Sequence, residues 1–414
     1  MVNKTLLNSF LIYLVIFFPI SILAGPAISL SVILLISLSS VYLLLINKKL
    51  SLELNDKIPV YILISIYLYL IFNNLISIDK NIGLERNLGF FRYILFFIII
   101  NYLFNEIDDK IKNYIFYFWI LIFAVVLFDI IYEFSFKENI LGFVSPDKKR
   151  IVSFFKDELV VGTFINGFFF ILIGFLIDKN FKRINYKLTV IILFLLLSII
   201  AIVLTGERSN TIKFFIGLLI LFFFDKKIKK IFKISFFVLF LLILIIAIFN
   251  STRLMHRYNN NLIQNISSSE KINEYIYFKL YKTGIKIFKE YPYFGIGNKN
   301  YRVVSCEKKY IVDKKLICNS HPHQVYIEFL SEHGLIGTII LLSLLYFLIF
   351  RLIAQKKITL NSIQIGAFSY LMISFIPVLP GGSFFSDFNS NFFWLNLSIM
   401  YAVSSDRNIF KKNN

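Results

Sequence analysis

Apolar runs of about twenty residues recur along this 414-residue chain and restrict what it can fold into. An α-helix needs about 20 residues to cross a hydrocarbon core of about 30 Å. Backbone groups in lipid must be hydrogen-bonded within their own segment, so these runs are expected to be helices. Segments of about ten residues that alternate apolar and polar positions, as in a transmembrane barrel, are not visible. With 57% hydrophobic residues, the sequence predicts an all-α, polytopic membrane protein.

About 12 transmembrane helices are predicted from the spacing of the apolar runs. The runs are residues 6–24, 27–46, 58–77, 87–104, 113–134, 158–177, 187–204, 210–224, 231–249, 332–350, 360–378 and 390–404. The first run lacks a small-residue cleavage site and is expected to be a retained span rather than a removed signal peptide. A long polar segment then divides a single integral-membrane domain into 1–249 (spans one to nine), 250–331 (a large outer loop region) and 332–414 (spans ten to twelve).

Lysine and arginine are distributed unevenly over the connections between these runs. Most of those in the short loops, together with those of both termini, fall on one side of the predicted membrane. Because basic residues are enriched in cytoplasmic loops, both termini are predicted to be cytoplasmic and the segment 250–331 to lie outside. Most of the net charge of +19 reflects this bias, so we do not interpret it as a sign of nucleic-acid binding.

Both cysteines of the chain, Cys306 and Cys318, fall in the outer segment. A pair confined to the exported side is typical of a disulfide in an oxidising compartment. We expect such a bond, with two free thiols as the alternative, since sequence alone does not test the geometry.

Arginines stand at the outer ends of several predicted spans. Arg208 lies in the very tight turn of "TGERSNTIKFF" (205–215), where it either grips a phosphate through bidentate hydrogen bonds or only anchors a helix end. Arg150 precedes the sixth span and is either a second anion contact or part of a solvated loop with local ion pairs. Arg92, with Arg86 at the surface before it, either extends outward or points into a polar cavity.

The outer segment contains one stretch with helical character, which ends at Pro292. Tyr281, Ile285 and Phe288 recur at spacings of three and four residues between lysines. This pattern predicts a basic amphipathic helix at the membrane surface, where anionic headgroups would attract it.

Two glycines, Gly295 and Gly297, follow in "PYFGIGNKNY". A GxG sequence belongs to a dinucleotide site only between a strand and a helix, and no βα unit surrounds this one. A tight turn is therefore expected.

Three of the four histidines lie in "CNSHPHQVYIEFLSEHGLIG", residues 318–337. Pro322 suits the first turn of a helix, with Ser320 or His321 as its cap, and this places His323 in the first helical turn. The positive end of the helix dipole there keeps an imidazole neutral, as a general base requires. The alternative is a pair of ordinary surface histidines at a helix start.

The same predicted helix carries Gly334 and Gly337 on nearly the same face as His323, where a neighbouring helix can approach closely. A metal site built from His321, His323 and Glu328 is the competing chemical hypothesis. It is less favoured, because no H-E-x-x-H motif or acidic cluster is nearby.

These motifs together resemble a known family. The histidine segment resembles the His-[Asn/Ser/Gln]-x9-Gly-x-x-[Gly/Thr/Tyr] pattern of the bacterial O-antigen ligases. In this sequence the pattern is formed by His323 and Gln324, then Gly334 after nine residues, and Gly337 after two more. The superfamily also contains the O-antigen polymerases. "YPYFGIGNKNY" resembles the family's Pro-x-Phe-Gly-x-Gly turn, and Arg208 and the segment 150–164 resemble its arginine-containing segments. The twelve-span layout also fits, and residues 150–337 carry all of these motifs.

The resemblance implies a metal-independent glycosyl transfer, without a cofactor, at the periplasmic face of a bacterial inner membrane. The donor would be a glycan on undecaprenyl pyrophosphate and the acceptor a sugar of the lipid A core. His323 is then the candidate base and Arg208 the candidate contact of the leaving pyrophosphate. Arg150, Arg257 and Arg302 are candidates for a second arginine, in no secure order. His321 either orients the acceptor or shares the role of the base.

Two alternatives remain at this point. An O-antigen polymerase, which joins polyprenyl-linked repeat units, would share the fold and the chemistry. A multi-pass transporter is less favoured, because it would place charges on broken helices at the membrane midplane, whereas the polar residues here gather at one face.

Overall fold

The computed structural model describes residues 4–46, 54–147, 149–180, 184–263, 272, 275–310, 319–354 and 359–410, and they are mostly helical. Within these ranges the β pairing is limited to an isolated bridge between Leu54 and Phe410. The elements are α1 (Lys4–Ile16), α2 (Phe18–Leu23), α3 (Pro26–Ile46), α4 (Ile58–Leu75), α5 (Lys80–Gly89), α6 (Phe91–Glu106), α7 (Asp109–Phe136), η1 (Ser153–Phe155), α8 (Val161–Asp178), α9 (Ile184–Leu204), α10 (Arg208–Phe224), α11 (Lys230–Asn250), α12 (Thr252–Met255), η2 (His256–Ile263), α14 (Ile276–Glu290), α15 (Tyr301–Val304), α16 (Val325–Ala354), α17 (Ser362–Ile373) and α18 (Asp387–Ala402). The all-α prediction is confirmed for this part of the chain.

In the described part of the chain, seven helical segments are long and apolar enough to cross a membrane. They are Ile58–Leu75, Lys80–Glu106, Asp109–Phe136, Val161–Asp178, Asn185–Leu204, Lys230–Asn250 and Val325–Ala354. Shorter apolar helices cover Leu6–Ile16, Pro26–Ser39 and Ser362–Ile373. Every predicted run overlaps a helix, although the run 360–378 is helical only over Ser362–Ile373. The chain is a polytopic helical membrane protein, while the number of twelve crossings stays a prediction.

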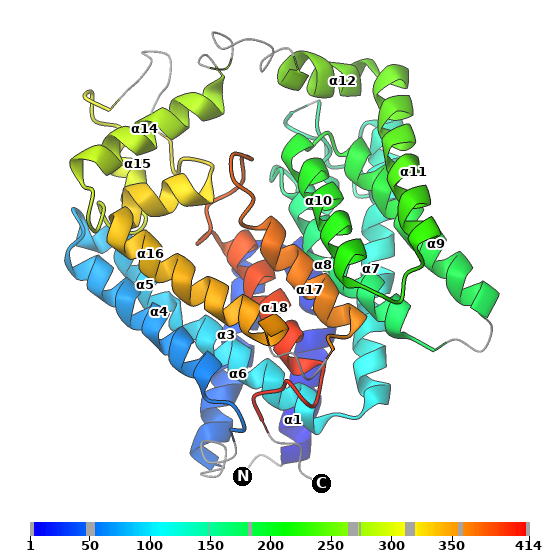
Figure 1. The fold of residues 1–414 in the computed structure, drawn as a ribbon, viewed down its shortest axis with the longest axis horizontal. Helices are drawn as coiled ribbons and strands as arrows, with labels where there is room; N and C mark the ends of the chain where they lie inside the picture. The colour runs from blue at the N-terminus through cyan, green and yellow to red at the C-terminus, as the bar shows by residue number, and fades with distance from the viewer. Residues whose placement is uncertain are drawn as a thin grey trace.

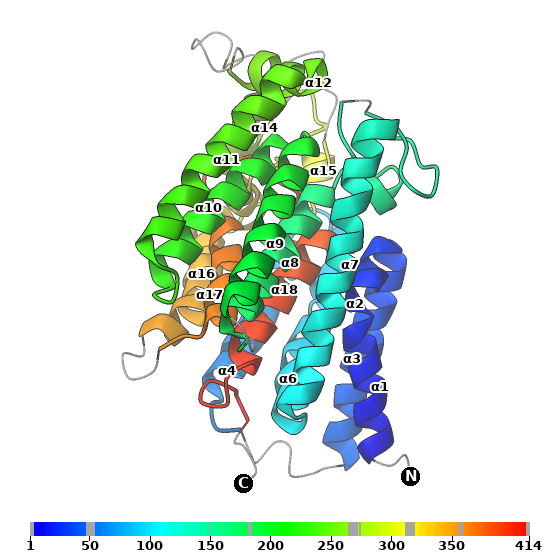
Figure 2. The ribbon, with the colours of Figure 1, turned by 90° about the vertical axis from the view of Figure 1, so that its right-hand side faces the viewer.

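Helices α8, α17 and α18 form the centre of the bundle, with α3, α6, α7, α9 and α10 around them (Figures 1 and 2). Glycines allow α8 and α17 to touch through their backbones. A Cβ on Gly366 would lie 1.9 Å from the Phe170 carbonyl oxygen, and one on Gly174 would lie 2.3 Å from that of Ser362. Small residues at such crossings are the usual means by which membrane helices pack.

The two ends of the bundle differ. Helix α1 begins, and α18 ends, at the lower end in Figure 1, whereas α12, α14 and α15 lie at the upper end. The described parts of the predicted outer segment therefore gather at the end opposite to the start of α1. The sidedness of the membrane itself stays a prediction.

The amphipathic stretch forms α14, which ends two residues before Pro292, as expected. Its buried residues include Leu280, Tyr281, Gly284 and Ile287, so the covered face differs from the predicted one in part. It packs on the start of α16, where a Cβ on Gly284 would lie 2.4 Å from the Ile327 side chain. The apolar face thus covers protein.

Helix α16 is broken at Gly334, whose φ of 65° and ψ of −172° are not helical. The prediction of one continuous helical face from His323 to Gly334 is therefore wrong. The cause is the 292–297 turn, which inserts its backbone at this point. The Ile296 amide donates to Ser331 O at 3.1 Å, and the Leu335 amide donates to Pro292 O at 2.7 Å.

Both glycine motifs are needed for this docking. A Cβ on Gly295 would lie 2.4 Å from the Glu332 carbonyl carbon, and one on Gly334 would lie 2.3 Å from that of Tyr293. Gly297, also at positive φ, donates to Glu332 O at 2.9 Å. Gly337 lies beside α4, since a Cβ there would overlap the Tyr69 hydroxyl.

Candidate active site

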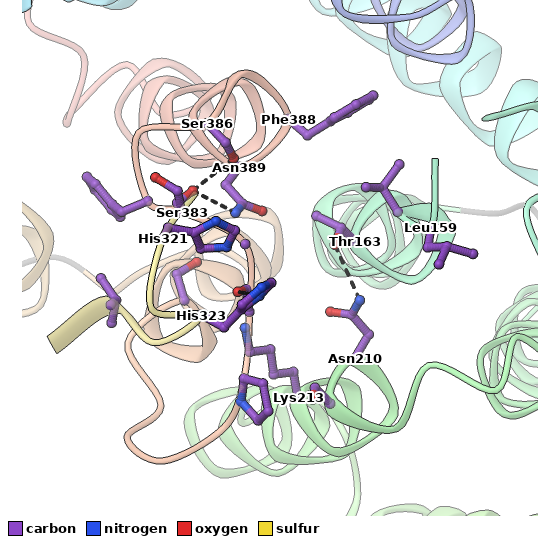
Figure 3. Close-up of a pocket in the computed structure, with 18 of the residues that line it drawn as sticks. Leu159, Thr163, Asn210, Lys213, His321, His323, Ser383, Ser386, Phe388 and Asn389 are labelled. Atoms are coloured by element: carbon purple, nitrogen blue, oxygen red, sulfur yellow. Dashed lines mark hydrogen bonds between the residues drawn. The ribbon is translucent and has the colours of Figure 1, made fainter. Parts of the chain in front are cut away.

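One cavity of about 580 Å³ opens at the end of the bundle where α12, α14 and α15 lie. The six charged or histidine residues predicted for the site all line it: Arg150, Arg208, Arg257, Arg302, His321 and His323. They come from segments up to 173 positions apart in the chain, and the fold brings them together. Figure 3 shows His321 and His323 on one wall, with Thr163 and Asn210 across the cavity.

His323 does not lie in a helical turn, so that prediction is wrong. Helix α16 begins at Val325, and Gln324 caps it by accepting from the Ile327 amide at 2.9 Å. His323 precedes the cap at a φ of 59°, in the left-handed region. The position of His323 in a first helical turn, on which the expected effect of the helix dipole depended, is therefore not observed.

The His323 ring is held by the 380–383 loop instead. Its Nδ1 lies 3.2 Å from Gly381 O, and the Gly381 amide donates to His323 O at 2.8 Å. A carbonyl oxygen only accepts, so Nδ1 must carry the proton and Nε2 must keep its lone pair. The Tyr277 ring packs edge-on against the imidazole at 5.5 Å. This arrangement leaves Nε2 as the basic nitrogen of a ring that lines the cavity.

His321 packs against this ring, with the two centroids 4.0 Å apart. Its Nδ1 lies 2.9 Å from the Ser320 hydroxyl, while its Nε2 is buried without a hydrogen-bond partner among the described residues. Burial, and then the neighbouring His323, lower the pKa of His321 to about 3. Burial also lowers the pKa of His323. Both rings are therefore neutral at pH 7.

Three arginines form a cluster on the other side of the cavity, which we call the first cation group: Arg150, Arg208 and Arg257. Gly206, at a φ of 70°, lets the turn before Arg208 touch the backbone before Arg150, where a Cβ would lie 2.8 Å from Lys149 O. The Arg257 Nε donates to Gly206 O at 3.2 Å. Burial, followed by the charges of Arg208 and Arg150, lowers the pKa of Arg257.

Acidic neighbours only partly balance this group. The buried Glu207 lies 3.8 Å from the Arg150 guanidinium, and Asp147 lies 3.8 Å from that of Arg257. Glu207 also accepts from Asn210 at 2.6 Å and from the Gly162 amide at 3.2 Å, which fixes its position. Guanidinium groups gathered at a cavity wall in this way suit a phosphate or pyrophosphate.

Several residues that line the cavity do not stand out as site candidates in the sequence. Lys213 lines the cavity below His323 (Figure 3), and Arg86, Tyr277 and the Gly381 loop also contribute. A lysine inside a predicted apolar span is a functional candidate by default, and this signal could have identified Lys213. The Gly381 loop carried no comparable signal.

The other residues singled out in the sequence are Arg92, the proposed metal ligand Glu328 and the two cysteines. Arg92 pairs with Asp387 at 3.4 Å and does not line the cavity. Glu328, proposed as a metal ligand, accepts from the Ser383 hydroxyl and the Phe384 amide. No group of three His, Cys, Asp or Glu suited to a metal occurs in the described ranges. Cys306 is disulfide-bonded, while its predicted partner Cys318 lies outside the described residues.

Comparison with known families finds a similarity over the middle part of the chain. Residues 193–342 match the model of the O-antigen ligase family. This segment is therefore similar to the O-antigen ligases. The match confirms the family suggested by the sequence motifs and includes Arg208, Arg257 and His323. No curated protein matches the chain. Similarity to the O-antigen ligase family supports a membrane enzyme of the glycosyltransferase type, with lipid-linked glycans as its class of substrate.

Proposed function

We propose that the chain is an O-antigen ligase, which transfers a glycan from undecaprenyl pyrophosphate to a sugar of the lipid A core at the periplasmic face. One observation carries the proposal. His323 and the first cation group line the same cavity, and the contact of His323 Nδ1 with Gly381 O leaves Nε2 as the unprotonated nitrogen, so a candidate base and a candidate pyrophosphate site share one space.

The reaction needs a proton acceptor and a stabilised leaving group. His323 Nε2 takes the proton of the acceptor hydroxyl as its oxygen bonds to the anomeric carbon. The bond from that carbon to the pyrophosphate oxygen breaks, and undecaprenyl pyrophosphate leaves with the electron pair and one additional negative charge. Arg150, Arg208 and Arg257 stabilise that charge. The imidazolium then releases its proton to solvent.

A deletion strain tests this function directly. Loss of a ligase leaves bare lipopolysaccharide core and causes polyprenyl-linked polymer to accumulate. Core that carries single repeat units would instead identify an O-antigen polymerase. An in vitro assay distinguishes a ligase from a polymerase in the same way. It combines the purified protein with a defined polyprenyl-pyrophosphate glycan and a defined core glycolipid.

The pH profile of transfer follows from His323. Burial lowers the pKa of His323 below its usual 6.5, and only the neutral ring accepts a proton. We expect the transfer rate to be constant from about pH 8 to about pH 6.5 and to fall on further acidification, about tenfold per unit below the pKa. His321, with a pKa of about 3, adds no step in this range. A rate that rises as the pH falls would contradict the assignment.

Removing charge from the first cation group should affect the chemical step. Arg208→Gln is expected to lower kcat by about 10²-fold or more, because the lost contact is strongest when the leaving group carries its full charge. Steady-state kinetics with saturating donor measure this effect. Lys149→Gln, an exposed neighbour that does not line the cavity, is the matched control and should stay near wild type. A rise in KM alone would show that Arg208 only binds the donor.

A further inference from the structure

Two further arginines line the cavity and have no part in the mechanism above. Arg86 belongs to α5 and Arg302 to α15. In Figure 1 these helices lie on the left of the molecule, whereas α10 and α12, next to the first cation group, lie on the right. Arg86 and Arg302 therefore form a second cation group on the opposite side of the cavity.

The electrostatic neighbours of each group agree with this separation. After burial and the His323 ring, Arg86 and Arg302 are the charges that lower the pKa of His321. The pKa of Arg257 responds instead to Arg208 and Arg150. The second cation group therefore acts on His321, whereas the arginines of the first group act on one another.

The second cation group is not neutralised by a direct partner. Within the described ranges, neither Arg86 nor Arg302 forms an ion pair. Lys299 adds a third positive charge close to both, and its own pKa is lowered by burial first and then by their charges. The buried Glu332 also lines the cavity and interacts electrostatically with Arg302.

Glu332 is arranged for a ligand as well. Its Oε1 accepts from the Tyr301 amide at 3.1 Å, while its Oε2 is buried and has no hydrogen-bond partner among the described residues. A buried carboxylate oxygen without a partner is costly, and a sugar hydroxyl would satisfy it. The His321 Nε2 is likewise buried without a described partner. Two arginines beside two buried polar atoms without described partners suit a sugar that also carries an anion.

We propose that Arg86 and Arg302 bind an anionic group, a phosphate or a carboxylate, on the acceptor glycolipid next to the sugar that receives the glycan. The inference rests on the proposed function, because it assigns the first cation group to the donor pyrophosphate. His323 then lies between the donor and the acceptor, where its base is required. The site selects acceptors by their charge.

The double variant Arg86→Gln/Arg302→Gln tests the inference with three acceptors. These are a core glycolipid with its phosphates, the same glycolipid after dephosphorylation, and a form in which both phosphates and carboxylates have been removed or amidated. For the wild-type protein we expect kcat/KM to fall about tenfold to a hundredfold when the recognised anion is removed from the acceptor. Most of this fall should come from a rise in KM for the acceptor. The acceptor at which the loss occurs identifies phosphate or carboxylate. In the double variant this dependence should disappear.

Lys80→Gln is the matched control, since it removes one charge from an exposed position of α5 that does not line the cavity. It should keep the wild-type dependence on acceptor charge. An equal loss by the double variant on all three acceptors would overturn the inference, as would an unchanged preference. If wild-type protein transfers to none of the acceptors, the proposed function itself fails, and the two failures are distinguishable.

Discussion

Replacing His323 with asparagine should lower the transfer rate by about 10³-fold or more while the protein remains inserted and folded. Asparagine is chosen because it tolerates a positive φ, and His323 has a φ of 59°. Its amide nitrogen can also donate to Gly381 O as Nδ1 does now. The variant therefore removes the Nε2 base and keeps the local backbone. Single-turnover transfer with saturating donor and acceptor measures the loss.

Two other histidines provide the comparisons for this variant. His256→Asn changes a histidine that does not line the cavity, so transfer should stay near the wild-type rate. His321→Asn should raise KM for the acceptor more than it lowers kcat, because we propose that His321 positions the acceptor while His323 accepts the proton. Near-wild-type transfer by a folded His323→Asn protein would refute His323 as the base. If His321→Asn lost the greater part of kcat, the two roles would have to be exchanged.

Much of the fold could be predicted from composition because the solvent of the spans is lipid. Each apolar run must satisfy its own backbone, and helix is the local solution regardless of what packs against it. The beginning of α16 could not be predicted in this way. Pro322 suits a helix start, yet the tertiary hydrogen bond from the Gly381 amide holds His323 outside the helix. The competing cap, Gln324, is an uncommon one.

The site was predicted where chemistry is visible in the sequence and missed where it depends on loop geometry. His321 and His323 stand out by type and position. The second arginine could not be chosen, because Arg150 and Arg257 are placed by the fold of two separate loops around the turn at Gly206. Arg86 has an ordinary surface sequence context, and only the contact of α5 with the turn at Asn298 brings it to the cavity.

The backbone contact between the 292–297 turn and α16 gives the second large effect. Gly334→Ala should destabilise the protein by about 2 kcal/mol or more, since the new methyl group meets the Tyr293 backbone and φ stays positive. Gly295→Ala should act similarly, because its methyl group meets the Glu332 backbone. Thermal unfolding of the purified protein in detergent measures both.

Gly142→Ala separates strain from the close contact. Gly142 also has a positive φ, of 80°, but a Cβ there would meet nothing within 4 Å. Gly142→Ala should therefore lower the stability only by the backbone strain. The additional loss of stability in Gly334→Ala then measures the docking of the 292–297 turn on α16. Because that turn leads into Tyr301 and Arg302 and the docked helix carries Glu332, transfer should also fall in Gly334→Ala but not in Gly142→Ala. Equal unfolding temperatures for the two variants would mean that the two segments are not held together through their backbones.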